Sequence, residues 1–414
     1  MTTLDRNLSL PAGIAPIAEP RGRHRVPTTG RLLLALLARV ERGSIVVETP
    51  DGASTWFGQH DADPAVLSIH DWRVARDTMQ RGDIGFAEGY IAGHWDTPDL
   101  TRLLTLLALN QPALERAFYG RRAATWLLRV RHWLNANTRR QARKNIVAHY
   151  DLGNDFYRLW LDETMTYSSA VFDGDLGKPL ALAQQAKYER ILAELALPAG
   201  AHILEIGCGW GGFAEVAARA GYRVTGLSLS DAQTAWARER LARAGLADRA
   251  EFRIEDYRDH RGTYDGVASI EMVEAVGERW WPTYFAKIRD ALVRGGRACV
   301  QGITIAEARF ARYRRETDFI QQYIFPGGML PSPAAFRREA ERAGLAVVNE
   351  HAFGLDYART LATWRERFHA RLDAVRALGF DERFVRIWDF YLAYCEAAFA
   401  RRSTDVVQFT LASA

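Results

Sequence analysis

The feature that most constrains this chain is a glycine-rich string at residues 205–212, Glu-Ile-Gly-Cys-Gly-Trp-Gly-Gly. Before it, the apolar run His202–Ile206 predicts a strand, and after it Gly211–Ala220 predicts a helix. Glycine lets the backbone turn sharply and lets a ligand approach the main chain, because no Cβ stands in the way. A strand, a glycine turn and a helix in this order predict a nucleotide-binding unit of an α/β fold.

The alternation of strands and helices continues beyond this unit. Four further strands are predicted at Tyr222–Leu227, Phe252–Ile254, Gly266–Ile270 and Ala298–Ile303, with a helix at Asp231–Ala244. Two long helices, Thr360–Leu378 and Asp381–Arg401, precede a last strand at Val406–Leu411. The irregular stretch 306–333 is too long for a plain connection, so we predict that it forms a lid. This order predicts a Rossmann-like sheet covered by helices on both faces.

The glycine turn fits two kinds of cofactor. Gly207, Gly209 and Gly212 satisfy the G-x-G-x-x-G spacing of dinucleotide folds, which also need an acid at the tip of the second strand to hold a ribose. That tip ends in Ser228 here, and an acid, Glu205, instead precedes the first glycine. A carboxylate at this place suits a nucleoside that carries a cationic amino acid. The turn therefore favours S-adenosylmethionine over a nicotinamide cofactor.

The part before the glycine turn divides by composition. Residues 1–30 are predicted to be a flexible leader, 31–112 a small α/β domain, 113–150 a basic helical linker, and 151–414 the domain with the glycine turn. Residues 116–150 contain no Asp or Glu, and two tryptophans stand among the arginines. This composition fits either a helix lying on an anionic lipid surface through residues 116–144, or a solvated linker whose tryptophans pack on the next domain.

Bulk composition excludes several classes of protein. The apolar run Leu32–Ala38 is too short to span a bilayer, and three scattered cysteines in 414 residues do not form a disulfide framework. We expect a cytoplasmic protein that is associated peripherally with the inner face of the membrane. The net charge of +4 is too small to identify a partner.

Several motifs together resemble the cyclopropane-fatty-acyl-phospholipid synthase family, which includes mycolic acid and other fatty-acyl methyltransferases. The resemblance runs from about His149 to the C-terminus, with a looser match over 80–100. The motifs that carry it are His149–Tyr157, Met165–Ser169, Gln184–Lys187, the glycine turn, Gly226–Ser230 with Gln233, Glu271–Glu274 and Tyr323–Gly328. The resemblance implies a class I methyltransferase with a seven-stranded sheet, a small N-terminal α/β domain and a helical lid.

The family's cofactor contacts can be carried over position by position. They imply that S-adenosylmethionine contacts Tyr167, Ser168, Glu205, Gly207, Cys208, Gly209, Gly211, Ser228, Leu229, Gln233, Asp256 and Tyr257. Asp256 is expected to accept a hydrogen bond from the adenine amino group. The substrate implied is the double bond of an unsaturated acyl chain of a membrane phospholipid.

The resemblance also implies a base. In the family an alkene attacks the sulfonium methyl, and a bound bicarbonate then removes a proton to close a cyclopropane ring. Glu274 and Tyr357 match two residues that hold the bicarbonate, whereas Gln301, Ser169 and Ala275 replace a histidine, a cysteine and a second histidine. Gln and Ser can still donate hydrogen bonds to an anion, but they do not relay protons as histidine does.

These departures leave bicarbonate use, and the choice between cyclopropanation and methyl branching, open. Cys395 matches a cysteine considered catalytic in the family, although a cysteine in an apolar helix is more often packing. Aromatic side chains at Tyr167, Tyr313, Phe319, Tyr323, Phe325 and Tyr357 are candidates for stabilising a cation.

Other functions remain to be distinguished. A nucleic-acid methyltransferase would explain the basic stretch, but no RNA-binding signature accompanies it, and we expect no nucleic acid partner. A lipid- or cofactor-binding protein without turnover is a second alternative, and a homodimer is left open. No metal site is expected.

Overall fold

The computed structural model describes residues 26–60, 62–118 and 152–413. Most of the basic stretch at 116–144, and the start of the motif at His149, lie outside these residues. None of the described helices combines the length and apolarity that crossing a bilayer requires.

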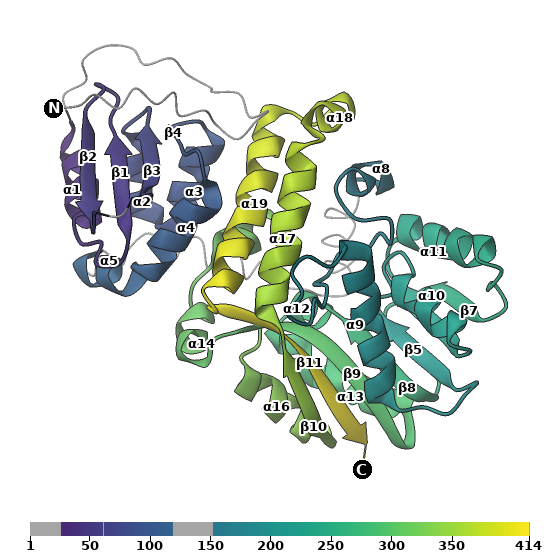
Figure 1. Cartoon of the computed structure of the whole chain (residues 1–414). Coiled ribbons are helices and arrows are strands. Elements are labelled where there is room, and N and C mark those ends of the chain that lie inside the picture. Colours follow the sequence, from purple (N-terminus) through teal and green to yellow (C-terminus); the bar gives the residue numbers. More distant parts are fainter. Residues whose placement is uncertain (1–25, 61, 119–151, 414) are drawn as a thin grey trace.

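A seven-stranded sheet forms the centre of the larger part of the molecule (Figure 1). Its strand order is β10-β11-β9-β8-β5-β6-β7. The strands are β5 (His202–Ile206), β6 (Arg223–Ser228), β7 (Ala250–Ile254), β8 (Tyr264–Ile270), β9 (Leu292–Ile305), β10 (Leu345–Ala352) and β11 (Thr404–Ser413). Strands β5 to β9 run parallel, while β11 is antiparallel to β9 and β10 is antiparallel to β11. The predicted seven-stranded, Rossmann-like sheet is confirmed.

Helices cover both faces of this sheet. On one face β5, β6 and β8 pack against α9 (Leu180–Leu195), α10 (Gly212–Arg219) and α11 (Asp231–Arg243). On the other face the core joins the sheet to α13 (Trp281–Ala291) and α16 (Pro333–Arg342). Side chains of a buried parallel strand alternate between these two cores: Ile203 faces one and Leu204 the other.

Two helices lie between the seven-stranded sheet and the N-terminal part (Figure 1). They are α17 (Gly354–His369) and α19 (Glu382–Ala400), separated by the short α18 (Leu372–Ala377). The prediction of one helix over Thr360–Leu378 was wrong, because the chain leaves the helix at Ala370 and Arg371. The apolar spacing of Phe368, Leu372 and Val375 continues across this break, so periodicity alone could not locate it.

The N-terminal part holds a four-stranded sheet of order β2-β1-β3-β4. Its elements are α1 (Thr28–Leu37), β1 (Ser44–Glu48), β2 (Ser54–Gly58), β3 (Ala65–Ile69), α2 (Arg73–Arg81), α3 (Asp83–Ile91), β4 (Trp95–Asp96), α4 (Leu100–Leu109) and α5 (Gln111–Phe118). Strands β1 and β2 pair antiparallel.

Buried charges join the N-terminal part to α19. The Tyr90 hydroxyl donates to Asp389 at 2.7 Å, and the fully buried Arg386 lies 2.8 Å from Asp96. Arg365 also donates to Asp389, at 2.7 Å. Because a buried charge is tolerated only when it is paired, these contacts tie α3 and β4 firmly to α17 and α19.

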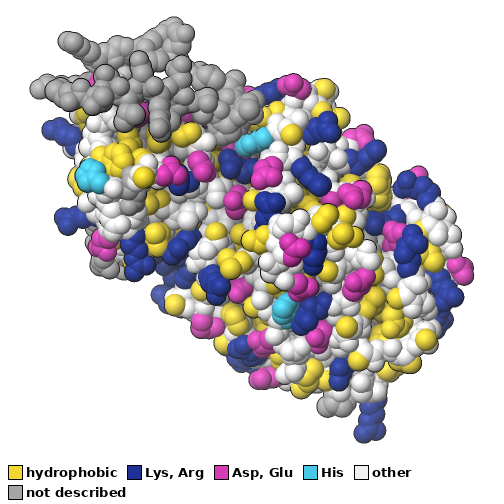
Figure 2. Space-filling model, viewed as in Figure 1, with side chains coloured by type: hydrophobic (Ala, Val, Ile, Leu, Met, Phe, Trp, Pro, Cys, Tyr) yellow, Lys and Arg dark blue, Asp and Glu magenta, His cyan; other side chains and the backbone are white. Residues whose placement is uncertain are grey.

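The stretch 306–333 contains α14 (Glu307–Tyr313) and α15 (Phe319–Tyr323) and runs beside the end of the sheet. The remaining short elements are α8 (Asn154–Arg158), α12 (Val273–Val276) and a 3-10 turn at Glu278–Trp280. On the face shown in Figure 2, basic and acidic side chains are interspersed over the described part of the molecule. Charge on this face therefore does not single out a partner.

Candidate active site

The glycine turn connects β5 to α10 and forms one wall of a large cavity. Gly207 has φ of 83°, and a Cβ there would lie 2.4 Å from the Met272 side chain. The N–H groups of Gly207 and Cys208 both donate to Leu227 O, at 3.0 and 2.9 Å. These two hydrogen bonds hold the turn against the end of β6, and the turn lines the cavity there.

The cavity has a volume of about 310 Å³ and two halves. The cofactor half is lined by Ser168, Glu205, Gly207, Cys208, Gly209, Ser228, Leu229, Gln233, Asp256 and Tyr257. The apolar half is lined by Tyr313, Ile320, Phe325, Met329, Leu330, Tyr391, Tyr394 and Phe399. Tyr167 also lines the cavity, and its hydroxyl lies 2.7 Å from that of Tyr391.

Eleven of the residues predicted to contact the cofactor line the cavity, while Gly211 does not. A Cβ on Gly211 would lie 2.9 Å from the Cβ of Ala237 in α11, and its φ is 79°. Gly211 thus allows close packing of the turn against α11. Its neighbour Gly212 lines the cavity instead.

Unpartnered polar atoms mark the cofactor half. Glu205 Oε2 and the Tyr257 hydroxyl are buried and have no hydrogen-bond partner among the described residues. Burial raises the pKa of Glu205 well above its usual value. A buried acceptor without a donor is unfavourable unless a ligand supplies one, and an amino group would do so here. The donor set of this half fits an amino-acid nucleoside.

Asp256 forms an ion pair with Arg258 that the sequence did not indicate. Arg258 Nε donates to Asp256 Oδ1 at 2.9 Å and its Nη2 donates to Oδ2 at 2.6 Å. The guanidinium also lies over the ring of Trp280, at 5.0 Å from its centroid. Asp256 lines the cavity in this orientation.

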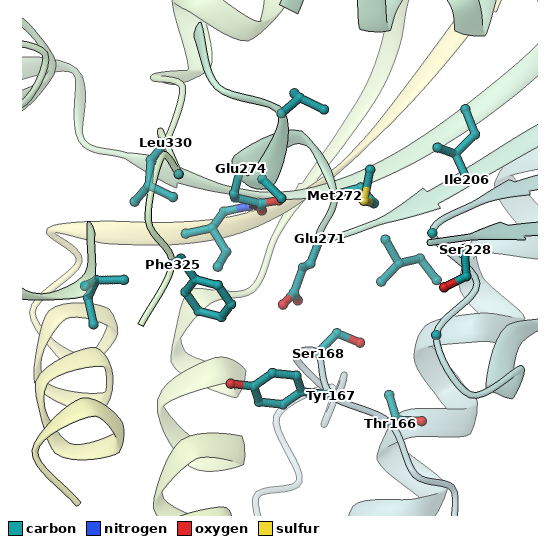
Figure 3. Close-up of a pocket in the computed structure, with 18 of the residues that line it drawn as sticks. Thr166, Tyr167, Ser168, Ile206, Ser228, Glu271, Met272, Glu274, Phe325 and Leu330 are labelled. Atoms are coloured by element: carbon teal, nitrogen blue, oxygen red, sulfur yellow. Dashed lines mark hydrogen bonds between the residues drawn. The ribbon is translucent and has the colours of Figure 1, made fainter. Parts of the chain in front are cut away.

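A single carboxylate, that of Glu271, gathers the donors that the resemblance placed around a bicarbonate. Ser169 N and Gln301 Nε2 both donate to Glu271 Oε1 at 2.8 Å, and the Tyr357 hydroxyl donates to Oε2 at 2.7 Å. We call Glu271 and these three partners the carboxylate centre. Figure 3 shows the Glu271 carboxylate pointing into the cavity between Phe325 and Ser168.

The backbone aims this carboxylate. Glu271 follows the last residue of β8 and has φ of 52°, in the left-handed region that a glutamate rarely adopts. Its N–H donates to Gln301 O at 2.8 Å, which holds the residue in this conformation. Strained backbone of this kind persists where the surroundings over-determine it, and it clusters at functional sites.

Glu274 lies near the carboxylate centre but makes none of these contacts. Its Oε1 accepts the Ile303 N–H, and its Oε2 is buried without a partner among the described residues. Burial, followed by repulsion from Glu271, raises the pKa of Glu274 to about 8. Glu274 is therefore mostly a neutral carboxylic acid at pH 7.

Ser169 and Gln301 do not line the cavity themselves, but both donate hydrogen bonds to Glu271, which does. The Ser169 side chain turns to its neighbour Ala170 O, so its backbone N–H makes the contact. Gln301 is fully buried and is held from behind by Gln408 Nε2 at 3.1 Å. Tyr357 lines the cavity directly.

Cys395 also lines the cavity, from α19. Burial raises the pKa of its thiol, so the reactive thiolate form is scarce at neutral pH. Of the six aromatic candidates, Tyr167, Tyr313, Phe325 and Tyr357 line the cavity, whereas Phe319 and Tyr323 do not.

Two charged residues in this region were quoted in sequence motifs but given no role: Glu271 and Lys187. Lys187 is fully buried in α9, beside Ser168. A signal for Glu271 was present in the chain, because a parallel strand ending in Ser-Ile delivers the next side chain to the carboxyl edge of the sheet. Sequence spacing did not indicate whether Glu271 or Glu274 would accept the hydrogen bonds from Ser169, Gln301 and Tyr357.

The comparisons with known proteins agree with this geometry. The family model described as mycolic acid cyclopropane synthetase matches residues 137–409. The chain is 44% identical over 361 residues to tuberculostearic acid methyltransferase UfaA1 of Mycobacterium tuberculosis, covering 84% of each chain. It is 31% identical over 352 residues to cyclopropane-fatty-acyl-phospholipid synthase of Escherichia coli K12, covering 83% of this chain and 87% of that one.

A solved structure matches as well. Mycolic acid cyclopropane synthase CmaA1, complexed with SAH and CTAB, superposes with a TM-score of 0.61 at 31% identity, over 66% of this chain and 98% of that one. Fold and cavity together define an S-adenosylmethionine-dependent class I methyltransferase. More particularly, the chain belongs to the mycolic acid cyclopropane synthetase family.

Proposed function

We propose that this enzyme transfers the methyl group of S-adenosylmethionine to the double bond of unsaturated fatty acyl chains in membrane phospholipids. The observation that carries the proposal is that one cavity joins the cofactor half to an apolar half lined by aromatic side chains. Relatives of this chain are named as fatty-acid methyltransferases or as a cyclopropane-fatty-acyl-phospholipid synthase.

The alkene of an acyl chain is a weak nucleophile, and the residues that line the cavity suit its methylation. The π electrons of the alkene form the new carbon–carbon bond while the carbon–sulfur bond breaks, which leaves positive charge on the acyl chain. An enclosed apolar wall holds the alkene in line and keeps out water that would trap the cation. The faces of Tyr167, Phe325 and Tyr391 are placed to stabilise that charge.

The carboxylate centre does not fit a bicarbonate. The three donors expected for the anion are already bound to Glu271, whose carboxylate has the same charge as bicarbonate and a similar planar pair of oxygens. We therefore propose Glu271 as the base. Three of its roughly four acceptor positions are used, and the remaining lone pair of Oε2 accepts the substrate proton. Its enclosure raises the Glu271 pKa above the usual value, toward the range in which a general base is effective.

We propose a methyl-branched alkene as the product, with cyclopropanation as the alternative. Glu271 removes a proton from a carbon beside the cation, and that C–H electron pair forms the new double bond. Two facts favour this outcome: Gln301 and Ala275 stand where histidines were expected, and the relative at 44% identity is named a methyltransferase rather than a cyclopropane synthase.

The test is incubation with radiolabelled S-adenosylmethionine and vesicles of unsaturated phospholipid. Label in the acyl chains supports the proposal, whereas label in added RNA, or none despite bound cofactor, contradicts it. Mild catalytic hydrogenation before mass spectrometry separates the products, because it reduces a branched alkene and leaves a cyclopropane intact.

The location of the enzyme is inferred from its proposed substrate. Phospholipid acyl chains lie in the bilayer, so we place the enzyme at the cytoplasmic face of the membrane. The basic residues within 116–144 are proposed to bind anionic head groups, and binding to anionic vesicles should then weaken steeply as salt is added. Binding that does not change with salt would remove that segment from the proposal.

A further inference from the structure

Lys187 is a buried cation that the proposed chemistry does not use. It lies in α9, its side chain is fully buried, and its Nζ donates a hydrogen bond of 2.5 Å to Ser168 Oγ. Among the described residues this is the one hydrogen bond made by Nζ, which also lies 4.7 Å from the ring centre of Tyr188. Burying an ammonium group is costly unless other groups balance its charge.

Carboxylates on three separate elements interact electrostatically with this ammonium. They are Glu271 after β8, Glu205 at the end of β5 and Asp162 after α8. Burial lowers the pKa of Lys187 to about 7, and the three carboxylates oppose that shift. The charge of Lys187 therefore interacts with Glu205 of the cofactor half and with Glu271 of the carboxylate centre, and this charge changes in the neutral range.

The contact with Ser168 fixes what the serine hydroxyl can do. An ammonium group donates and cannot accept, so Ser168 Oγ is the acceptor and its one hydrogen is free for another partner. Gln184 Nε2 donates to Ser168 O at 2.9 Å and holds the backbone in place. In Figure 3 the Ser168 hydroxyl points toward the half of the cavity that holds Ile206 and Ser228. Ser168 is thus prepared as a donor toward the cofactor half.

A zwitterionic amino acid carries both an ammonium and a carboxylate. Glu205, with its unpartnered Oε2, is the acceptor for the ammonium. The structure assigns to Lys187 the complementary role: it positions and polarises Ser168 as the donor to the cofactor's carboxylate, so that Lys187–Ser168 and Glu205 recognise the two charges of the amino-acid end. This inference rests on the use of S-adenosylmethionine proposed above.

The test compares two ligands by calorimetry: S-adenosylhomocysteine and its decarboxylated analogue, which keeps the nucleoside and the amine. Lys187→Met should weaken S-adenosylhomocysteine roughly 10- to 100-fold, as expected for the loss of a charge-assisted hydrogen bond. It should leave the affinity of the analogue nearly unchanged. Ser168→Ala should show the same selectivity, and the double variant should lose little more than either single variant.

The matched control is Arg190→Met, which removes from the same helix a cation whose guanidinium pairs with Glu194 and not with Ser168. Both of its affinities should equal those of the wild type. An equal loss of both ligands in Lys187→Met, or no loss, would overturn the inference. A wild-type protein that binds neither ligand would overturn the cofactor assignment itself.

The wild-type protein supplies a readout that does not depend on a variant folding. The charged form of Lys187 is the one that acts, so affinity for S-adenosylhomocysteine should be highest below a pH of about 7 and fall as the pH rises through it. The decarboxylated analogue corrects for titration of the ligand's amine, which both share. A parallel pH profile for the two ligands would contradict a role for Lys187.

Discussion

The cofactor half and the carboxylate centre belong to one cavity but are built differently. Apart from Ser168, the cofactor half is formed by the glycine turn and by the segments that follow β6 and β7, which come one after another along the chain. The carboxylate centre is formed by side chains and one N–H from four distant segments, at Ser169, Glu271, Gln301 and Tyr357. The first is determined by local sequence, whereas the second depends on tertiary packing.

The difference shows where this enzyme can have diverged from its relatives. The glycine turn tolerates few substitutions, because neighbouring residues lie too close to most of its glycines to leave room for a side chain. In our proposal the carboxylate of Glu271 takes the place of the bound bicarbonate that the resemblance implied. Substitutions should therefore affect turnover most at the carboxylate centre and folding most at the glycine turn.

The largest effect is expected at Glu271. Glu271→Gln keeps the shape but removes the basic lone pair and reverses one hydrogen bond, so turnover should fall about 1,000-fold, within the range for loss of a general base. Binding of S-adenosylhomocysteine should change little. The measurement is methyl transfer to phospholipid vesicles together with calorimetry.

Glu271→Gly sharpens this prediction, because it reopens the space of the carboxylate while leaving Tyr357, Gln301 and Ser169 as donors. Added bicarbonate should then restore part of the turnover, whereas the wild-type rate should not respond to bicarbonate. A wild-type rate that depends on bicarbonate, or a Glu271→Gln enzyme with normal turnover, would rule out Glu271 as the base.

A smaller effect is expected at Tyr357. Tyr357→Phe removes the donor to Glu271 Oε2, which stabilises the charged carboxylate, so turnover should fall roughly 10- to 30-fold. Loss of this hydrogen bond raises the Glu271 pKa further. Because the base acts when deprotonated, the acidic limb of the rate profile should move to higher pH. An unshifted limb would show that Tyr357 does not act on Glu271.

Except for Gly211, the residues that the sequence predicted to contact the cofactor line one cavity. The strand, turn and helix around Glu205, and the polar tip at Ser228, depend on neighbours within a few residues, and the structure places them as expected. Gly211 differs because its role is contact with Ala237, a residue of another helix. Position in the motif could not separate a ligand contact from a packing contact.

The carboxylate centre could not be predicted to the same degree. Tyr357 and Gln301 were identified, but their common partner was expected to be Glu274 with a bicarbonate rather than Glu271. Two glutamates three residues apart can point to different places once one of them adopts a left-handed backbone. That conformation is imposed by the bond from Glu271 N to Gln301 O, which links β8 to β9.

The glycine turn should respond in stability rather than in chemistry. Gly211→Ala places a methyl group 2.9 Å from Ala237 and forces a positive φ on alanine, which should lower the free energy of unfolding by about 1–3 kcal/mol. Turnover per folded molecule should stay near that of the wild type. Denaturant unfolding and single-turnover rates measure both, and a stable but inactive variant would contradict a packing role.

The smallest effect is expected at Glu274, although it is a glutamate in the same cavity wall as Glu271. Its pKa of about 8 makes it a neutral carboxyl group at pH 7, and glutamine resembles that form in size and in its acceptor for the Ile303 N–H. Glu274→Gln should therefore change turnover less than about threefold at pH 7. Glu271→Gln, measured beside it, makes the same chemical change three residues away, so the ratio of the two rates tests the assignment directly. A larger loss at Glu274 than at Glu271 would transfer the role of base to Glu274 and leave Glu271 as its support.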